Sequence, residues 1–281
     1  MTLTRITGQT YDEERALYHL QDATVDNCTF AGPADGESAL KEAANVHLDK
    51  CCFSLRYPLW HTRDFSLTDC RMDDLTRAAI WYADRGRLTD CHLEGIKCLR
   101  ECEDIRLERC RLVSPECGWK CRNLRLSDCS VEGEYAFFEV TDGVFDRLEF
   151  KGKYSFQYTE NLVIENANLD TKDAFWHSKN VTVKNSTVKG EYLGWYAENL
   201  TLIDCCIIGT QPLCYCTGLR LVNCRMEDTD LSFECSEVEA AINGHILSVK
   251  NPRSGHITAD SIGEILLDNP VMETDCAIHT K

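Results

Sequence analysis

The sequence predicts an all-β protein, a single-stranded right-handed parallel β-helix of about eleven or more coils. Three observations support this fold class: a repeat with a period of nineteen, alternation of apolar and polar residues inside each repeat, and columns of Asn and Asp at fixed places. A repeat near this length marks a solenoid, in which each unit buries its apolar face only by stacking on its neighbours.

The repeat is anchored on a column of small residues, most of them cysteine. The steps between the first four anchors vary slightly in length, and every step from Cys91 onward has the same length of nineteen. We expect these side chains to point inward, because Cys packs as a compact apolar residue. The anchors are Cys28, Cys51, Cys70, Cys91, Cys110, Cys129, Leu148, Ala167, Ser186, Cys205 and Cys224.

Each unit contains two short strands and a sharp bend. In the run NLTLIDCCI, Leu200 and Leu202 alternate with polar residues, and the alternation resumes at Cys205 after a fixed break. Alternation with a period of two indicates strands, and the break indicates a tight turn. Asn or Asp often precedes the anchor, and both tolerate left-handed backbone at such a bend. The column comprises Asn27, Asp69, Asp90, Asp128, Asn166, Asn185, Asp204 and Asn223.

We read residues 1–281 as one β-helix domain, because the repeat continues without a linker. Its expected parts are an N-terminal cap at 1–22, regular coils at 23–237, and irregular C-terminal coils with a cap at 238–281. The run DEERALYHL from Asp12 predicts a short capping helix, since acidic residues precede apolar ones. The run AGPADGES predicts a turn-rich loop in the first unit.

Composition limits the function. Lys and Arg number 30 against 46 Asp and Glu, a formal charge of −16, which disfavours nucleic acid and anionic membranes as partners. No apolar run is long enough to span a membrane, and the run MTLTRITGQT has no secretory hydrophobic core, so we expect a cytoplasmic protein. No motif for a phosphate-bearing or other cofactor occurs, and we expect none.

The 18 cysteines are best read as thiols in a chain of this kind. Two C-x3-C pairs, Cys98 with Cys102 and Cys117 with Cys121, raise the question of zinc. Four extended residues span about 13 Å, too far for one tetrahedral ion with Zn–S bonds of about 2.3 Å. We therefore expect no metal site.

The third segment of each unit carries the aromatic residues. All five tryptophans fall ten residues before an anchor, in one column that also holds Arg100 and Gln157. The rings could fill the core, but Arg and Gln are rarely buried unpaired, and exposed contiguous aromatics mark binding surfaces. The predicted ligand-binding residues are Trp60, His61, Trp81, Tyr82, Arg100, Trp119, Lys120, Gln157, Tyr158, Trp176, His177, Trp195 and Tyr196.

Two functions fit such a strip. Aromatic rings can stack on the C–H faces of sugars. The first hypothesis is therefore a protein that binds or modifies carbohydrate, with a neutral glycan or small sugar as its ligand. Trp, Tyr and Arg also dominate protein interfaces, so the alternative is a non-catalytic scaffold or a homo-oligomer. Whether the protein is an enzyme stays open.

Three residues are weak catalytic candidates. Glu101 and Glu139 lie two coils apart, roughly 9.6 Å by strand spacing, and inverting glycosidases hold their carboxyl groups about 6.5–9.5 Å apart. Lys120 between them favours a salt-bridged ladder instead, because a cation lowers a carboxyl pKa. His177 is the third candidate, as a residue in contact with ligand.

Nearly the whole chain resembles a bacterial family of uncharacterised proteins described as a domain of unknown function. The resemblance implies a right-handed β-helix similar to that of pectate lyases, and it supplies no catalytic residues. It rests on the runs SLRYPLWH, KYSFQYTENL, DAFWHSKNVTV, GEYLGWYAENLTL, IIGTQPLCYC and SIGEILLDN.

Overall fold

The computed structural model describes residues 3–32 and 37–281. These residues form about fourteen coils of parallel β-solenoid and contain no helix. Two compact units make up the chain, Met1–Gly143 (unit 1) and Val144–Lys281 (unit 2). The predicted all-β, parallel β-helix class is confirmed, while the prediction of a single domain stays a prediction.

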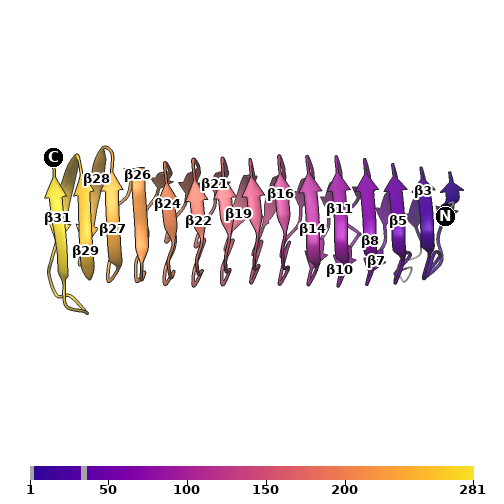
Figure 1. The fold of residues 1–281 in the computed structure, drawn as a ribbon, viewed down its shortest axis with the longest axis horizontal. Coiled ribbons are helices and arrows are strands. Elements are labelled where there is room, and N and C mark those ends of the chain that lie inside the picture. The colour runs from indigo at the N-terminus through magenta and orange to yellow at the C-terminus, as the bar shows by residue number, and fades with distance from the viewer. Residues whose placement is uncertain (1–2, 33–36) are drawn as a thin grey trace. The chain divides into compact units, whose positions relative to one another are not determined.

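Unit 1 stacks its strands into parallel sheets, one strand per coil (Figure 1). The first sheet contains β1 (Thr4–Thr7), β3 (Gln21–Asp26), β5 (Ala44–Asp49), β8 (Arg63–Thr68), β11 (Asp84–Thr89), β14 (Glu103–Glu108) and β16 (Arg125–Ser127). The second sheet contains β2 (Thr10–Tyr11), β4 (Thr29–Ala31), β6 (Cys52–Ser54), β9 (Arg71–Met72), β12 (His92–Glu94), β15 (Arg111–Val113) and β17 (Ser130–Glu134). A third, very short sheet contains β7 (Leu59–Trp60), β10 (Ile80–Trp81) and β13 (Leu99–Arg100).

Unit 2 has the same first and second sheets. Its first sheet contains β18 (Val144–Asp146), β20 (Val163–Glu165), β22 (Thr182–Lys184), β24 (Thr201–Ile203), β26 (Leu219–Glu227), β27 (Glu237–Ile242), β29 (Ser254–Ala259) and β31 (Asp275–Thr280). Its second sheet contains β19 (Glu149–Lys153), β21 (Asn168–Asp170), β23 (Thr187–Lys189), β25 (Cys206–Ile208) and the C-terminal half of β26. A separate pair consists of β28 (His245–Lys250) and β30 (Ser261–Leu266).

The bend before each anchor is left-handed, as predicted. Asn27, Asp69 and Asp204 have φ angles of 51°, 51° and 53°. Lys50 and Arg109 adopt the same conformation, with φ angles of 50° and 52°. The bend therefore belongs to the coil geometry, and Asn or Asp is the favoured but not the required residue.

The expected N-terminal capping helix is wrong. The segment from Glu13 to His19 forms turns whose backbone N–H groups bond to the next coil. Arg15 N donates to Glu37 O at 2.9 Å and Leu17 N donates to Ala39 O at 2.8 Å. Donors used between coils cannot close helical turns, so this segment is the third segment of its own coil. The centre of the predicted AGPADGES loop, residues 33–36, lies outside the described residues.

The anchors pack in the core, as predicted. All eight anchor cysteines are at most 3% exposed, and every cysteine among the described residues is free. The thiols also act as weak donors, because Cys51 Sγ lies 3.2 Å from Val25 O and Cys224 Sγ lies 3.3 Å from Leu202 O. Cys98 Sγ and Cys117 Sγ are 3.2 Å apart in neighbouring coils.

Candidate functional site

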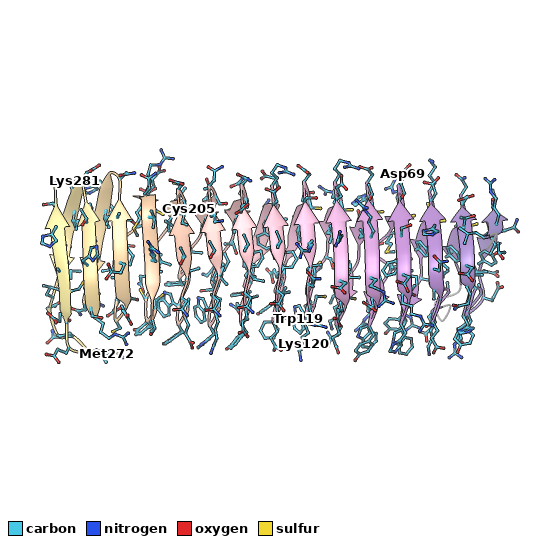
Figure 2. All side chains as sticks on the ribbon, viewed as in Figure 1. Asp69, Trp119, Lys120, Cys205, Met272 and Lys281 are labelled. Carbon is cyan, nitrogen blue, oxygen red and sulfur yellow. The ribbon has the colours of Figure 1, made fainter. Side chains whose placement is uncertain are left out.

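The aromatic residues lie on a turn in the third segment, where residues with left-handed backbone alternate with residues of ordinary negative φ. Around Trp176, both Phe175 and His177 have positive φ angles, 62° and 53°. Two consecutive residues then face outward while the residues on either side face inward. Phe175 is 2% exposed and Ser178 is fully buried, whereas Trp176 and His177 are partly exposed. Figure 2 shows the corresponding pair in unit 1, Trp119 and Lys120, projecting beyond the strands.

We call the first outward position the Trp column and the second the outer column. In unit 1 the Trp column is Trp60, Trp81, Arg100, Trp119 and Phe138, and the outer column is His61, Tyr82, Glu101, Lys120 and Glu139. In unit 2 the Trp column is Gln157, Trp176, Trp195 and Cys214, of which Cys214 is buried, and the outer column is Tyr158, His177, Tyr196 and Tyr215. Together these columns are the aromatic strip of each unit. The strip contains every predicted ligand-binding residue.

In unit 1 the Trp column is a stack of rings and cations. Trp60 and Trp81 stack with their centroids 5.6 Å apart and their planes 12° apart. Lys41 Nζ lies 4.1 Å from the Trp60 ring, and the Arg100 guanidinium lies 5.9 Å from Trp81 and 5.6 Å from Trp119. Cation–π attraction therefore extends the stack at both ends of the Trp60–Trp81 pair.

The outer column of unit 1 begins aromatic and becomes charged. His61 and Tyr82 stack at 5.1 Å, and a hydrogen bond to Glu101 raises the pKa of Tyr82. Glu101 also pairs with Arg100 at 3.0 Å, and Lys120 pairs with Glu139 at 3.8 Å. Each charge in this part of the strip therefore has a partner of opposite sign.

In unit 2 the Trp column is tied to the backbone of the next coil. Trp176 Nε1 donates to Tyr192 O at 2.6 Å, and Trp195 Nε1 donates to Gln211 O at 2.8 Å. Gln157 Nε2 donates to Asp173 O at 2.9 Å. The amide side chain of Gln157 thus makes the bond to the next coil that the indole N–H makes elsewhere in the column. Trp176 and Trp195 stack at 5.5 Å with planes 6° apart.

The outer column of unit 2 is a continuous ladder of four rings. Tyr158 and His177 stack at 4.9 Å, His177 and Tyr196 at 5.0 Å, and Tyr196 and Tyr215 at 4.9 Å. Tyr158 is 51% exposed and Tyr196 is 43% exposed. The ladder thus presents a regular row of phenol hydroxyls and one imidazole to solvent.

Ring orientation corrects one expectation about how the strip could bind. Stacking on sugars requires open ring faces, but within each ladder the faces lie against neighbouring rings. Edges, hydroxyls and ring nitrogens remain for a ligand. The strip nevertheless faces outward, so the alternative in which the tryptophans fill the core is not what the structure contains.

The weak catalytic candidates do not form a catalytic pair. Glu101 is engaged by Arg100 and Tyr82, and Glu139 is engaged by Lys120. The predicted Glu–Lys–Glu ladder is present only in its second half, because Arg100 replaces Lys120 as the partner of Glu101. His177 is held between two tyrosine rings.

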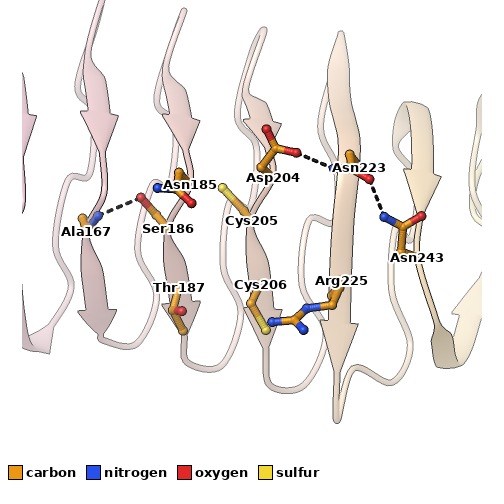
Figure 3. Close-up of a pocket in the computed structure, with 10 residues that line it drawn as sticks. All are labelled: Ala167, Asn185, Ser186, Thr187, Asp204, Cys205, Cys206, Asn223, Arg225 and Asn243. Carbon is orange, nitrogen blue, oxygen red and sulfur yellow. Dashed lines mark hydrogen bonds between the residues drawn. The ribbon is translucent and has the colours of Figure 1, made fainter.

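Sequence reasoning missed two surface depressions away from the strip. One in unit 1, of about 270 Å³, is lined by Cys52, Arg71, Asp73 and His92 among others. One in unit 2, of about 380 Å³, lies at the bend between the first and second sheets and includes Asn185, Asp204 and Arg225 (Figure 3). The Asn and Asp column signals a bend in the sequence, but the pattern alone does not show what its side chains do.

The described residues contain neither a cluster of metal-binding side chains nor a helix that could span a membrane. Within residues 3–32 and 37–281, no group of three or more His, Cys, Asp or Glu side chains is placed to hold a metal ion. Across those ranges there is also no helix long and apolar enough to cross a membrane.

Comparison with known families identifies the chain. The family model described as "Protein of unknown function (DUF3737)" matches residues 4–279. The chain belongs to this family. The DUF3737 match covers nearly the whole chain, so the resemblance drawn from the sequence is confirmed. No curated protein matches this DUF3737 chain.

Several solved structures resemble this DUF3737 chain as β-helices. The Streptococcus pneumoniae surface adhesin PfbA has a TM-score of 0.49 at 8% identity, covering 95% of this chain and 85% of PfbA. The A-module of the Azotobacter vinelandii mannuronan C-5 epimerase AlgE6 has a TM-score of 0.32 at 8% identity, covering 98% and 87%. The catalytic domain of a GH87 α-1,3-glucanase in complex with nigerose has a TM-score of 0.37 at 8% identity, covering 100% and 64%. Likeness at this level carries no argument about function.

Proposed function

We propose that the aromatic strip is a binding surface for a neutral glycan. The ladder Tyr158–His177–Tyr196–Tyr215 carries the proposal, because it places polar ring edges in a row at 4.9–5.0 Å. Phenol hydroxyls donate and accept hydrogen bonds, and a neutral imidazole does one of each. Sugar hydroxyls need this mixture of donors and acceptors along a surface.

The charges of the strip favour a neutral ligand over an anionic one. In unit 1 the Arg100–Glu101 and Lys120–Glu139 pairs neutralise each other, so neither cation is left for a polyanion. The formal charge of −16 for the whole chain repels acidic polysaccharides as well. The proposal is for binding rather than bond cleavage, because Glu101 and Glu139 are both engaged in ion pairs.

The test is a titration with neutral oligosaccharides, selected first on a glycan array and followed by isothermal calorimetry. The variant Tyr158→Phe/Tyr196→Phe keeps the stacked rings and removes two exposed hydroxyls. We expect its affinity to fall by about tenfold or more, equivalent to about 1.4 kcal/mol. Tyr11→Phe, whose ring packs on Phe30 outside the strip, is the matched control and is expected to bind normally.

Two results would overturn the proposal. One is the absence of binding to every neutral oligosaccharide on the array by the wild-type protein. The other is equal affinity in the wild type and the Tyr158→Phe/Tyr196→Phe variant, since the ligand would then not touch the ladder.

A second candidate function, self-association, has its own observation. The C-terminal part of unit 2 exposes three apolar side chains that are near one another in the sequence, Ile265, Leu267 and Val271, by 45%, 57% and 82%. Exposed apolar side chains that form a patch mark interaction sites. In solution we expect a dimer by light scattering that becomes monomeric in Leu267→Asp/Val271→Asp. A wild-type protein that is monomeric at high concentration contradicts this second candidate.

A further inference from the structure

The outer column of unit 2 repeats one ring per coil over four coils. Neighbouring ring centroids are 4.9, 5.0 and 4.9 Å apart along Tyr158, His177, Tyr196 and Tyr215. The planes of successive rings differ by 16°, 7° and 14°, so the four rings are oriented alike. The row follows the strand spacing of about 4.8 Å, and it offers four similar positions in a straight line.

An ion pair ends this row on its C-terminal side. Tyr215 N donates to Glu234 O at 2.7 Å, which places Glu234 in the coil after the last ring. Glu234 Oε1 lies 2.9 Å from Lys250 Nζ. The outer column of unit 1 holds a shorter row, the stacked pair of His61 and Tyr82. A row of four rings is therefore particular to unit 2.

A polar column runs beside the rings, two residues farther along each coil. Its exposed members, in register from coil to coil, are Glu160, Lys179, Glu198 and Thr217. The residue between the two columns is buried, as Ser178 is between His177 and Lys179. Glu198 Oε1 lies 3.1 Å from Lys179 Nζ. The two carboxylates of this column are two coils apart, roughly 9.6 Å by strand spacing.

A ligand that contacts all four rings must repeat at the interval of the coils. A chain of pyranose sugars joined 1,4 through equatorial bonds is straight, and each sugar advances it by close to one strand spacing. Successive sugars of such a chain are turned by half a revolution, so the same sugar edge returns at every second unit. That interval matches the separation of Glu160 and Glu198. An axial link curves the chain into a helix, which leaves a straight row after one or two sugars.

We infer that the row binds a straight, neutral β-1,4-linked glycan that lies along the coil axis of unit 2, with one sugar against each ring. The inference rests on the proposed function, since it names the glycan class for the same strip. Sugar hydroxyls meet the ring edges, because neighbouring rings cover the ring faces. Each such contact is weak, but contacts made by one chain reinforce one another, because each later contact is intramolecular.

The test compares oligosaccharides of different shape and length by isothermal titration calorimetry. One set is β-1,4-linked and contains glucose, mannose or N-acetylglucosamine, and the other is α-1,4-linked glucose. For at least one β-linked series we expect the affinity to rise severalfold with each sugar from the disaccharide to the tetrasaccharide, and to level off by the hexasaccharide. For the α-linked series we expect no gain beyond the disaccharide.

A variant at one end of the row tests the number of positions. Tyr158→Phe keeps the ring and removes one exposed hydroxyl. A β-linked tetrasaccharide uses all four rings, so we expect its affinity to fall by about fivefold, the effect of one hydrogen bond. A disaccharide still finds an intact pair at Tyr196 and Tyr215, and its affinity should stay within about twofold of the wild type. Tyr11→Phe is the control and should leave both affinities unchanged.

Three outcomes overturn the inference while the proposed function stands. The first is that α-linked chains bind as tightly as β-linked ones and lose affinity in Tyr158→Phe/Tyr196→Phe. The second is that the affinity for β-linked chains does not grow beyond the disaccharide, or that Tyr158→Phe binds the tetrasaccharide as well as the wild type does. The third is that neither series binds but another neutral glycan on the array does. If the whole array is silent, the proposed function falls together with the inference.

Discussion

The stacked tryptophan pairs of the two units have nearly the same ring geometry and different hydrogen bonding. Their centroids are 5.6 Å apart in the Trp60–Trp81 pair and 5.5 Å apart in the Trp176–Trp195 pair. Both indole N–H groups of unit 2 donate to a backbone carbonyl of the next coil. The indole N–H groups of Trp60 and Trp81 are buried without a partner among the described residues.

Coil length explains part of this difference. In unit 2 each bonded carbonyl lies 16 residues after the tryptophan, a register that the regular coils preserve. The coil from Trp60 to its strand partner Trp81 is longer than these regular coils by two residues, so the 16-residue register does not apply to Trp60. Trp119 in unit 1 recovers the bond, donating to Tyr135 O at 2.5 Å. Nothing in the structure explains the missing partner of Trp81.

The difference shows that ring stacking and hydrogen bonding to the next coil, which we call fastening, are separate properties of the Trp column. In unit 2 the column fastens neighbouring coils, and Gln157 does so without a ring. In unit 1 Trp119 makes the same bond, while Trp60 and Trp81 have cations over their ring faces instead. The strip of unit 1 is therefore the less tightly fastened of the two.

The largest expected effect separates the core from the strip. Phe175→Ala removes a side chain that is 2% exposed and stacked on Phe156 at 5.4 Å, so we expect it to lower the free energy of unfolding by about 3–5 kcal/mol. Trp176→Ala should cost about half as much, because its ring is partly exposed, and should weaken glycan binding. Urea denaturation of both variants measures this. A larger loss for Trp176→Ala than for Phe175→Ala would show that the tryptophan is the core residue.

The next effect concerns the cation in unit 1. Arg100→Ala removes a guanidinium from between Trp81 and Trp119 and leaves Glu101 without its ion pair. We expect a loss of about 1–2 kcal/mol and stronger acrylamide quenching of tryptophan fluorescence, because two ring faces become accessible. Arg106→Ala, on the exposed side of β14, is the control. Unchanged quenching in Arg100→Ala would mean that the guanidinium does not cover the rings.

Most of the fold could be predicted from the sequence, because the signals were local and repeated. Alternation placed short strands such as β24 and β25, and Asn and Asp marked bends whose φ angles are left-handed. The N-terminal segment failed because Ala16, Leu17 and Leu20 also suit a helix, while bonds from Arg15 and its neighbours to the next coil decide the outcome.

The candidate site was predicted only in outline. Arg100 and Gln157 favoured an outward-facing Trp column, since neither is readily buried unpaired, but the sequence left open that the tryptophans fill the core. The roles of these two residues differ, however, and depend on what the neighbouring coil offers: ring faces to Arg100 and a backbone carbonyl to Gln157. The two surface depressions were missed because they appear only when side chains of successive coils are placed together.

A smaller effect tests the fastening bond directly. Trp176→Phe keeps a ring and removes the N–H that bonds to Tyr192 O, so we expect a loss of about 1 kcal/mol from the bond in addition to the smaller ring contact. Trp81→Phe removes an N–H that has no partner among the described residues, so only the ring contact is lost. Thermal unfolding of Trp176→Phe and Trp81→Phe measures the difference. Equal losses of stability in the two variants would contradict the separation of stacking from fastening.

The smallest effect is a pair of opposite pH dependences. Burial raises the pKa of Asp173 in unit 2, so its folded form binds a proton more tightly than the unfolded chain does. Its charge therefore destabilises the fold at neutral pH, and this penalty disappears as the pH falls through the folded pKa. In unit 1 the Arg109 guanidinium lowers the pKa of Asp90, which contributes stability above the unfolded pKa that is lost as the pH falls through the folded one.

Asparagine variants should reveal both signs. At pH 7 we expect Asp173→Asn to melt slightly above the wild type and Asp90→Asn slightly below it. Both differences should shrink as the pH is lowered toward 4, because each carboxylate then becomes increasingly protonated in at least one of the two states. Melting curves at several pH values measure this. If Asp173→Asn melted below the wild type at pH 7, a favourable contact of the charged carboxylate would outweigh the cost of its burial beside the Trp column.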